Sequence, residues 1–530
     1  MELLNIYETL YKHFGAFSNQ AYEILKYSVR SSNYNLHEIS RHTGIGFRTV
    51  RDVINLFFND IIVSNDILTI SKRLENIFLN DLDMDIENDL TNTELKMQEI
   101  ISGFSFHNKN LDHISAIPLT CCKRAEYISN KYDVSHCNLL FLGDHDFTSI
   151  AVAMLSKSRN INYKITVIDI DNNVLSYIDS IREKYKLQIR LIYSDFRFNI
   201  PTNLCDSFDV VFTDPPYTPN GMGVFLNKAI QLVKDNPFST IHICYKAAEQ
   251  SNKLGWLVQN EISKRKLYLK EILNNYNIYY DAEAIGYRSN LYTCNLTPDS
   301  KKVIENFGTE INIYTHGNSS VESQAKNTIF MEDFMQGYNY IKDQLKITDL
   351  FYIGNISFNN NNKLKLNQFI SQKESGIFHI LNNKEYLIDV TDLKDSIELR
   401  ILLWCNFQKF YLRCNRNLLD NEESNYFIRF IRTLFCFREI KSFDKTVLYE
   451  VKIDTRSISG ELLSNCIGNR GSVKNLLVKT ISNKYNYTKN QVRNIIDAFN
   501  IIELADSALF YLPDSLIKKL INHLNEVKIN

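Results

Sequence analysis

The sequence of 530 residues has no long apolar run and no obvious targeting segment. No uninterrupted hydrophobic stretch approaches the ~18 residues that a membrane-spanning helix requires, so we expect no membrane partner. The first residues, Met1 to Asn5, lack the basic flank of a secretory signal peptide. These two absences predict a soluble, cytoplasmic protein.

Metal-ligand spacing is also missing. The ten cysteines include no Cys-x-x-Cys pair, and the adjacent Cys121 and Cys122 do not have the spacing of zinc ligands. We therefore predict that no metal is bound. Cysteines in this pattern are typical of buried thiols in a reducing cytosol.

The formal net charge of the chain is close to zero, and this value bears on which partners the protein attracts. The 60 Lys and Arg residues and the 61 Asp and Glu residues leave a formal charge of −1. This balance gives no overall attraction to nucleic acid, so nucleic-acid binding would need a local basic face. With 44% hydrophobic residues, the chain is long enough to bury two or more cores.

The most informative motif is Asp214-Pro215-Pro216-Tyr217. The two prolines stiffen the turn through their fixed φ, the aspartate can accept hydrogen bonds from an amine, and the tyrosine ring supports a substrate or its cation. Ordinary surface turns share this composition. Over a bound sulfonium donor, however, this turn is typical of group transfer to an amine nitrogen.

Upstream of this motif, apolar runs alternate with helix-length segments such as Phe147 to Ser156. The runs are Leu139 to Leu142, Ile165 to Ile168, Ile189 to Tyr193, and Val210 to Phe212. They predict the strands of a parallel, doubly wound α/β sheet. Because ligands bind beyond the carboxyl ends of such strands, the polar residues after the four runs should line one nucleoside crevice.

Two of these residues suit particular parts of a nucleoside. Asp169 follows the second run and is placed to accept hydrogen bonds from ribose hydroxyls, while Asp195 follows the third run and suits the exocyclic amine of adenine. Either residue alone is often only a helix cap. The residues assigned to donor binding are Gly143, Asp169, Ile170, Asp195, Phe196 and Pro215.

The first turn of the predicted sheet is unusual. A methyltransferase normally has a second glycine where this chain has His145, between Asp144 and Asp146. Two carboxylates there would repel a methionine carboxylate and attract a free ammonium group. This pattern favours decarboxylated S-adenosylmethionine as the donor, with S-adenosylmethionine as the alternative.

Together these segments resemble the branched-chain polyamine synthases, or bis(aminopropyl)spermidine synthases. The similar segments are residues 141–150, 167–171, 194–197, 212–218 and 289–292, and the resemblance covers about residues 1–298. It implies a winged-helix-like module followed by a Rossmann-like, class I methyltransferase-type domain. It also implies aminopropyl transfer from decarboxylated S-adenosylmethionine to a secondary amine of a polyamine such as spermidine, releasing methylthioadenosine.

The sequence departs from this family at the first turn. The family has an acidic residue implicated in catalysis at the position of His145. An amine with a pKa near ~10 must lose its proton before it attacks carbon. An imidazole with an ordinary pKa of ~6.5 can accept that proton. Four interpretations of His145 therefore stay open: it acts as the base, it serves a different amine, it caps a helix, or it marks a loss of activity.

The predicted chemistry is an in-line displacement at the carbon beside the sulfonium, with most of the rate supplied by positioning. In this hypothesis Asp144 and Asp146 hold cationic amines, and His145 or Asp214 removes the proton. Tyr217 packs against the acceptor nitrogen.

Both ends of the chain carry a helix-turn-helix pattern. Residues 35–44, a helix from Phe47 to Phe58 and the apolar stretch Ile61 to Ile70 predict a winged-helix-like module. Val492 to Phe499 has the spacing of Val50 to Phe57 and precedes an apolar, hairpin-like stretch ending near Leu512, which makes a second winged helix a candidate. Such modules fit a homodimer or a lid better than DNA binding.

The region between them is predicted to be an α+β unit without an assigned role. Its candidate strands are Leu350 to Ile353, Ile377 to Leu381, Glu385 to Val390, Phe410 to Cys414 and Val447 to Ile453, with helices near Met331 to Leu345 and Asn425 to Phe435. The predicted domains are thus a winged-helix-like module (1–80), a connecting segment (81–118), the Rossmann-like transferase domain (119–305), the α+β unit (311–460) and the candidate second winged helix (461–530).

Two further functions stay open at this point. One is a transfer of a methyl or amino-carboxypropyl group from S-adenosylmethionine, since Asp-Pro-Pro-Tyr recurs in N-methyltransferases that act on flipped bases. The other is a non-catalytic regulator that senses a nucleoside or polyamine in the crevice and binds DNA through its terminal modules.

Overall fold

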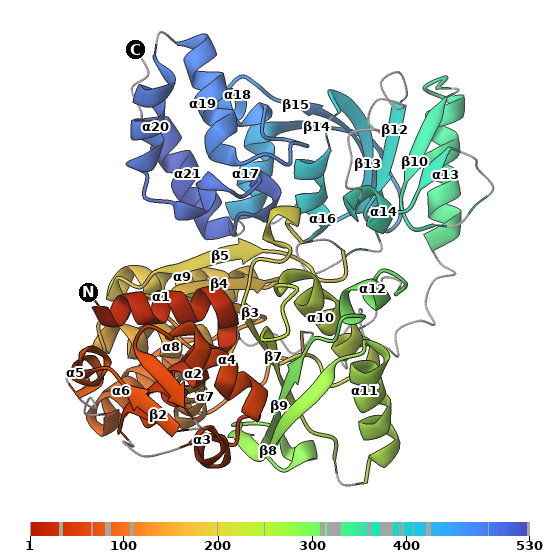
Figure 1. The fold of residues 1–530 in the computed structure, drawn as a ribbon. Helices are drawn as coiled ribbons and strands as arrows, with labels where there is room; N and C mark the ends of the chain where they lie inside the picture. The colour runs from red at the N-terminus through yellow and green to blue at the C-terminus, as the bar shows by residue number, and fades with distance from the viewer. Residues whose placement is uncertain are drawn as a thin grey trace.

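A computed structural model describes residues 2–30, 35–64, 67–79, 86–106, 111–198, 200–248, 250–307, 313–314, 330–347, 349–356, 358, 362–371, 385–391, 393, 397–405, 407–419, 426–485 and 487–526. Three parts follow one another along the chain (Figure 1). They are an N-terminal set of helices with a hairpin, a seven-stranded sheet with its helices, and a C-terminal part with a second sheet.

The seven-stranded sheet has the strand order β5-β4-β3-β6-β7-β9-β8. Its strands are β3 (Asn138–Leu142), β4 (Lys164–Asp169), β5 (Ile189–Tyr193), β6 (Val210–Thr213), β7 (Thr240–Tyr245), β8 (Tyr268–Ile278) and β9 (Arg288–Asn295). Strands β3 to β7 are parallel, and β9 runs antiparallel to both of its neighbours. The four apolar runs predicted to be strands are confirmed as β3 to β6.

The order of the strands creates the crevice that the sequence predicted. From β3 the chain passes to β4 and β5 on one side, and then crosses to β6 and β7 on the other. The helices of this part are α6 (Ile86–Gly103), α7 (Pro118–Lys131), α8 (Thr148–Ser158), α9 (Asn172–Tyr185), α10 (Pro219–Leu232), α11 (Asn252–Lys264) and α12 (Ser300–Ile304). A switch point of this kind leaves a binding site beyond the carboxyl ends of β3 and β6.

The N-terminal part has its own hydrophobic core. It contains α1 (Glu2–Phe14), α2 (Ser18–Arg30), α3 (Leu36–Thr43), α4 (Phe47–Leu56), β1 (Ile61–Ser64), β2 (Ile67–Ile70) and α5 (Lys72–Leu79). Asn35 caps α3 in a capping box with Glu38, and Gly44 ends that helix at a φ of 68°. The helices and the β1–β2 hairpin lie where the sequence placed them, and the identification of this part as a winged helix stays a prediction.

The C-terminal part is built on a six-stranded sheet of order β11-β10-β12-β13-β15-β14. Its strands are β10 (Leu350–Ile353), β11 (Lys363–Leu364), β12 (Glu385–Asp389), β13 (Lys409–Asn415), β14 (Phe435–Ser442) and β15 (Thr446–Ile453). Four predicted strands and both predicted helices, now α13 (Phe330–Asp343) and α17 (Tyr426–Leu434), are confirmed. The predicted strand at 377–381 lies outside the described residues. Strand β14 was missed because it continues directly from α17 and carries charged residues.

The other helices of the C-terminal part are α14 (Leu366–Ser371), α16 (Ile397–Arg400), α18 (Ile458–Ser464), α19 (Val473–Lys484), α20 (Lys489–Asp497) and α21 (Asp514–Glu526). The hairpin expected after residue 499 is wrong, because Ile502–Ala505 and Leu509–Tyr511 form short 3-10 helices. Glu503 explains this conformation: its side chain is buried and accepts hydrogen bonds from Arg182 and from the backbone of Leu191, which draws the segment onto β5.

The C-terminal part packs on the β5 edge of the seven-stranded sheet, above α9 in Figure 1. One continuous hydrophobic core runs from α6 through the sheet into α21. The domain boundary predicted between residues 305 and 311 therefore does not separate two independent cores. Across the described residues, no helix is both long and apolar enough to span a bilayer.

Candidate active site

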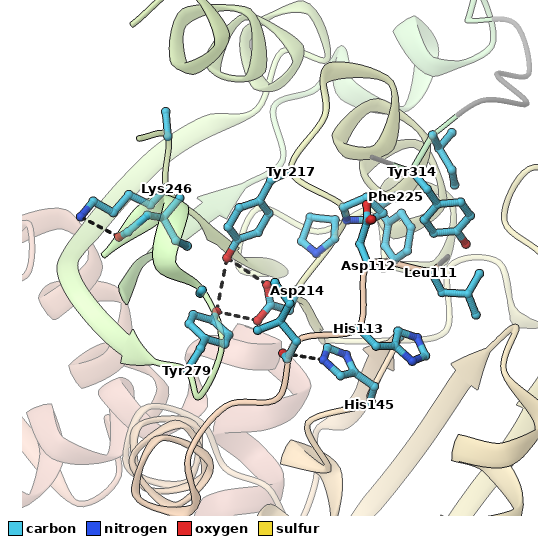
Figure 2. A pocket seen from close by; sticks show the side chains of 18 of the residues that line it. Leu111, Asp112, His113, His145, Asp214, Tyr217, Phe225, Lys246, Tyr279 and Tyr314 are labelled. Carbon is cyan, nitrogen blue, oxygen red and sulfur yellow. Dashed lines mark hydrogen bonds between the residues drawn. The ribbon is translucent and has the colours of Figure 1, made fainter. Parts of the chain in front are cut away.

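A cavity of about 430 Å³ lies at the carboxyl ends of β3, β4 and β6. Of the residues assigned from the sequence, Gly143, His145, Asp169, Ile170, Phe196, Asp214, Pro215 and Tyr217 line it, whereas Asp144, Asp146 and Asp195 do not. Figure 2 shows Asp214, Tyr217 and Tyr279 on one side of the cavity and Phe225 and Tyr314 on the other. The cavity therefore has an apolar, aromatic end and a polar end.

The aromatic end has the features of a nucleoside site. Gly143 adopts a φ of 69°, which a residue with a side chain rarely adopts. A Cβ atom added at position 143 would lie 3.5 Å from the Phe225 ring. The Asp169 carboxylate accepts hydrogen bonds from the backbone N–H groups of Asp144 (2.9 Å) and Asp171 (2.8 Å). Burial raises the pKa of Asp169, and these hydrogen bonds oppose the rise. Its position is compatible with the predicted contact to ribose.

Asp195 does not occupy the position predicted for it. Its side chain is buried and forms an ion pair with Arg197, whose Nη2 lies 2.7 Å from Oδ2. The backbone N–H of Arg197 also donates to Oδ1 at 2.9 Å. The carboxylate thus fixes the turn after β5, and the neighbouring Phe196 is the residue that faces the cavity.

The polar end is built around Asp214. Its Oδ2 accepts hydrogen bonds from Tyr279 Oη at 2.7 Å and from Arg124 Nη2 at 3.0 Å, and its Oδ1 accepts one from Tyr217 Oη at 3.2 Å. Burial raises the pKa of Asp214, while the Arg124 guanidinium opposes that rise. All four residues of the Asp-Pro-Pro-Tyr turn line the cavity, so the turn presents both its acid and its ring there.

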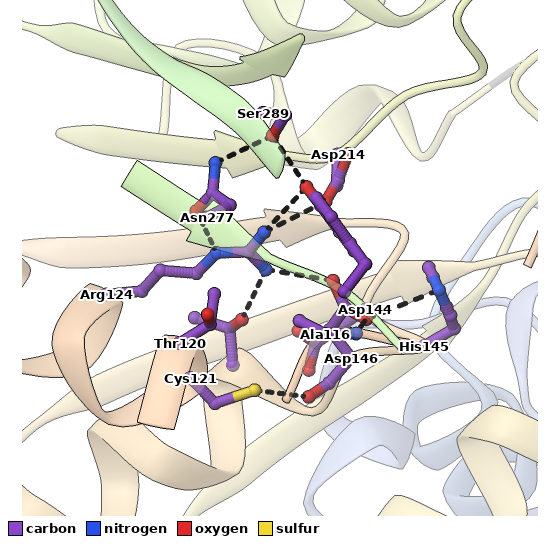
Figure 3. A network of polar contacts seen from close by, with 12 residues as sticks. Ala116, Thr120, Cys121, Arg124, Asp144, His145, Asp146, Asp214, Asn277 and Ser289 are labelled. Carbon is purple, nitrogen blue, oxygen red and sulfur yellow. Dashed lines mark hydrogen bonds and ion pairs between the residues drawn. The ribbon is translucent and has the colours of Figure 1, made fainter. Parts of the chain in front are cut away.

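Arg124 of α7 is the centre of a buried polar network that the sequence did not predict (Figure 3). Besides Asp214, it donates to Asp146 Oδ2 at 2.9 Å, Thr148 Oγ1 at 3.2 Å and Asn277 Oδ1 at 2.8 Å. No motif marks Arg124. The one available signal is an arginine on a helix face that otherwise buries small and apolar side chains.

Asp144 and Asp146 turn away from the cavity, contrary to their predicted role as ligands of cationic amines. Asp146 pairs with Arg124 and accepts a hydrogen bond from the backbone of Ala116 at 2.6 Å. Burial works against the charge, but His145 and Arg124 hold the pKa of Asp146 below its ordinary value. Asp144 accepts from the backbone of Ser149 at 3.2 Å, and burial raises its pKa to about 8.

His145 lines the cavity and stacks on His113, with ring centres 4.7 Å apart. Its Nε2 donates to the carbonyl oxygen of Ile114 at 2.7 Å and lies 3.4 Å from Asp146 Oδ1. Burial alone would lower the pKa of His145, but the Asp146 carboxylate and the Ile114 carbonyl raise it above its ordinary value. The imidazole is therefore more readily protonated than a free histidine.

The raised pKa of Asp144 predicts a pH-dependent stability difference. Between its ordinary value of 3.8 and about 8, Asp144 keeps its proton in the folded state and loses it in the unfolded state. Wild-type stability attributable to this group is therefore present below pH 4 and is lost as the pH rises toward 8, by up to ~1.4 kcal/mol per pH unit. Asp144→Asn should raise the thermal midpoint relative to wild type more at pH 8 than at pH 5.

Thermal unfolding at both pH values tests this expectation. The exposed Asp206 offers a control, because Asp206→Asn changes the same functional group outside the site. An Asp144→Asn difference of the same size at pH 5 and pH 8 would contradict the assignment.

The fold and the crevice together define a class I methyltransferase-like domain of the Rossmann type. Residues 94–343 match the family model described as the branched-chain polyamine synthase A C-terminal domain. This part of the chain is therefore similar to the branched-chain polyamine synthase family.

Individual relatives share 30% or less of their residues with this chain over the matched stretches. An uncharacterised protein of Methanocaldococcus jannaschii is 30% identical over 206 residues, which are 39% of this chain and 49% of that protein. The N(4)-bis(aminopropyl)spermidine synthase of the same organism is 26% identical over 39% of this chain and 57% of its own length. The chain thus spans about half the length of these curated relatives.

Among solved structures, the branched-chain polyamine synthase of Thermus thermophilus is similar, in a complex with N4-aminopropylspermidine and 5′-methylthioadenosine. It is 15% identical, with a TM-score of 0.35, and the match covers 56% of this chain and 92% of that one.

Proposed function

We propose that this protein is an aminopropyltransferase. In this proposal it moves an aminopropyl group from decarboxylated S-adenosylmethionine to an amine of a polyamine such as spermidine and releases methylthioadenosine. The observation that carries the proposal is the position of Asp214, to which Tyr217 and Tyr279 donate hydrogen bonds. These three residues lie at one end of the cavity, and the other end fits a nucleoside. The family model that residues 94–343 match supports the same reaction class.

The reaction needs few groups from the protein. The lone pair of the acceptor nitrogen attacks the carbon beside the sulfonium, the carbon–sulfur bond breaks, and its electron pair leaves sulfur as a neutral thioether. One proton must leave the nitrogen. Asp169 would hold the ribose, the Asp214 carboxylate would accept a hydrogen bond from the acceptor amine, and the Tyr217 ring would pack against it. Holding the two reactants in line supplies most of the rate.

Asp214 is a better candidate for the base than His145. The Nε2 proton of His145 is already donated to the Ile114 carbonyl, and the same nitrogen lies 3.4 Å from Asp146 Oδ1, so Nε2 is engaged inside the protein and is not placed to take a proton from an amine. Asp214 lies at the polar end of the cavity with a pKa above that of an ordinary carboxyl group, which improves it as a base. His145 then serves to hold the first turn and to balance charge.

This assignment predicts the pH profile of His145→Gln, since glutamine keeps a donor for the Ile114 carbonyl. We expect its kcat/KM to fall less than tenfold and to stay a constant fraction of wild type from pH 6 to pH 9. If His145 were the base, that fraction would decrease as the pH rises through the histidine pKa. Steady-state rates of both proteins in one buffer series distinguish the two.

A mass-spectrometric assay of the purified protein tests the proposed function. Spermidine is offered with decarboxylated S-adenosylmethionine in one reaction and with S-adenosylmethionine in another. Methylthioadenosine and an aminopropylated amine should form only with the decarboxylated donor. If neither donor reacts, the proposal is refuted.

Amino-carboxypropyl transfer from S-adenosylmethionine is the second candidate. The observation that favours it is the orientation of Asp144 and Asp146, whose carboxylates are bonded inside the protein and do not face the cavity. Their charges therefore select less strongly against a donor carboxylate than the sequence suggested. In the same assay this activity would add an amino-carboxypropyl group to the amine.

A further inference from the structure

Arg400 of the C-terminal part is fully buried at the β5 edge of the seven-stranded sheet. Its guanidinium carbon lies 3.7 Å from the centre of the Tyr193 ring and 4.8 Å from the centre of the Phe427 ring. Tyr193 belongs to β5 and Phe427 to α17, so the guanidinium is held between the two parts of the molecule. A planar cation between aromatic faces has a defined orientation.

The hydrogen bonds of Arg400 link the same two parts. Nη1 donates to the carbonyl oxygens of Phe510 at 2.9 Å and Leu512 at 2.8 Å. Nη2 donates to Asn172 Oδ1 at 3.3 Å and forms an ion pair with Asp514. The backbone N–H of Asp514 donates to the same Asn172 oxygen at 3.1 Å. Asn172, the first residue of α9, is therefore held from two directions by the C-terminal part.

Both anchor points adjoin the wall of the cavity. Asn172 follows the loop of Asp169 and Ile170, and Tyr193 precedes the loop that contains Phe196. Asp169, Ile170 and Phe196 line the aromatic end of the cavity. The backbone N–H of Ser194 donates to the carbonyl oxygen of Asp169 at 2.9 Å, which ties the two loops together. A displacement of Arg400 would thus reach the donor end without a direct contact to substrate.

Another interface contact lies farther from these loops. Lys519 of α21 bonds to Asp179 at 2.7 Å and pairs with Glu183, both in the later turns of α9. Its side chain is 30% exposed, in contrast to the buried guanidinium. Lys519 contributes to the interface but contacts neither the loop after β4 nor the loop after β5 within the described structure.

We propose that the C-terminal part is a positioning element of the donor site and that Arg400 is its principal positioning residue. The inference rests on the proposed function only in taking the occupant of the aromatic end to be an adenosine sulfonium or its thioether product. Arg400 fixes the loop that presents Asp169 and the loop that presents Phe196. A part of the chain that follows the family match of residues 94–343 thereby takes part in donor binding.

Calorimetric titration of the full-length protein with methylthioadenosine tests this inference without requiring turnover. The variants are Arg400→Met, Arg400→Lys, which keeps the charge but not the planar fork, and the control Lys519→Met. We expect the Kd to rise about tenfold in Arg400→Met, less in Arg400→Lys, and less than twofold in Lys519→Met. Donor KM should follow the same order, with kcat at saturating donor and acceptor KM changed less than threefold.

Thermal unfolding of all three variants separates positioning from loss of fold. Arg400→Lys, the milder change, should retain a folded protein with weakened donor binding. Equal affinities in wild type and both Arg400 variants, or an equal loss in Lys519→Met, would overturn the inference. A wild-type protein that binds methylthioadenosine tightly yet transfers no group would refute the proposed function while leaving the Arg400 comparison decisive.

Discussion

Asp214→Asn should lower kcat by roughly 10²- to 10⁴-fold, the range expected when a positioned acid–base group is lost. Asparagine has nearly the same shape, so the Asp-Pro-Pro-Tyr turn keeps its backbone, but an amide cannot take a proton from the acceptor amine. The amide also replaces one of the oxygens that accept hydrogen bonds from Tyr217, Tyr279 and Arg124. Single-turnover product formation, followed by mass spectrometry, measures the loss.

Two further measurements isolate the chemical role of Asp214. Methylthioadenosine affinity should change less than threefold, since Asp169 and Phe196 lie at the other end of the cavity. Asp206→Asn makes the same chemical change at an exposed position and should retain full activity. Full turnover by Asp214→Asn would remove this residue from the mechanism.

Arg124→Met should destabilise the protein by about 3–5 kcal/mol, because it leaves buried carboxylates without their cation. The Arg124 side chain has no exposed surface, and it pairs with Asp146 at 2.9 Å and with Asp214 at 3.0 Å. Methionine fills much of the same volume, so the loss reports on charge and hydrogen bonding more than on packing. Urea unfolding followed by circular dichroism gives the change in the free energy of unfolding.

A second substitution tests the cause of that destabilisation. In Arg124→Met combined with Asp146→Asn, one of the two uncompensated charges is gone, and we expect at least a third of the lost stability to return. Arg124→Lys keeps a charge but not the five-donor fork, and it should lie between wild type and Arg124→Met. A single Arg124→Met variant within 1 kcal/mol of wild type would contradict this account.

The sheet that forms the site was predictable because its strands are buried on both faces. Such strands read as short, continuous apolar runs, and each of β3 to β6 ends in a polar turn. The antiparallel edge of this sheet, formed by β9 and β8, was not predictable in the same way. Strand β8 alternates irregularly and has shifts of register against β9, so its sequence lacks the regular period of an edge strand.

For the site, the sequence indicated which turns matter but not how their side chains point. Asp144, Asp146 and Asp195 follow the strands as Asp169 and Asp214 do, yet they do not line the cavity. Their carboxylates bond to Ser149, Arg124 and Arg197. The orientation of each carboxylate depends on a partner elsewhere in the fold. Asn277 reaches the network from β8, and Tyr279 from the position directly after that strand. No motif marks either residue.

The network around Arg124 also explains why a histidine is compatible with the first turn. His145 Nε2 lies 3.4 Å from Asp146 Oδ1, and the Asp146 carboxylate raises the pKa of the imidazole, so a proton on His145 offsets part of the negative charge that Asp146 and Asp214 place around Arg124. An acidic side chain at position 145 would instead add a further carboxyl group to this cluster, whose negative charge a bound cation or a proton would have to offset. The chain therefore carries, in His145, a second group beside these carboxylates that can hold a positive charge.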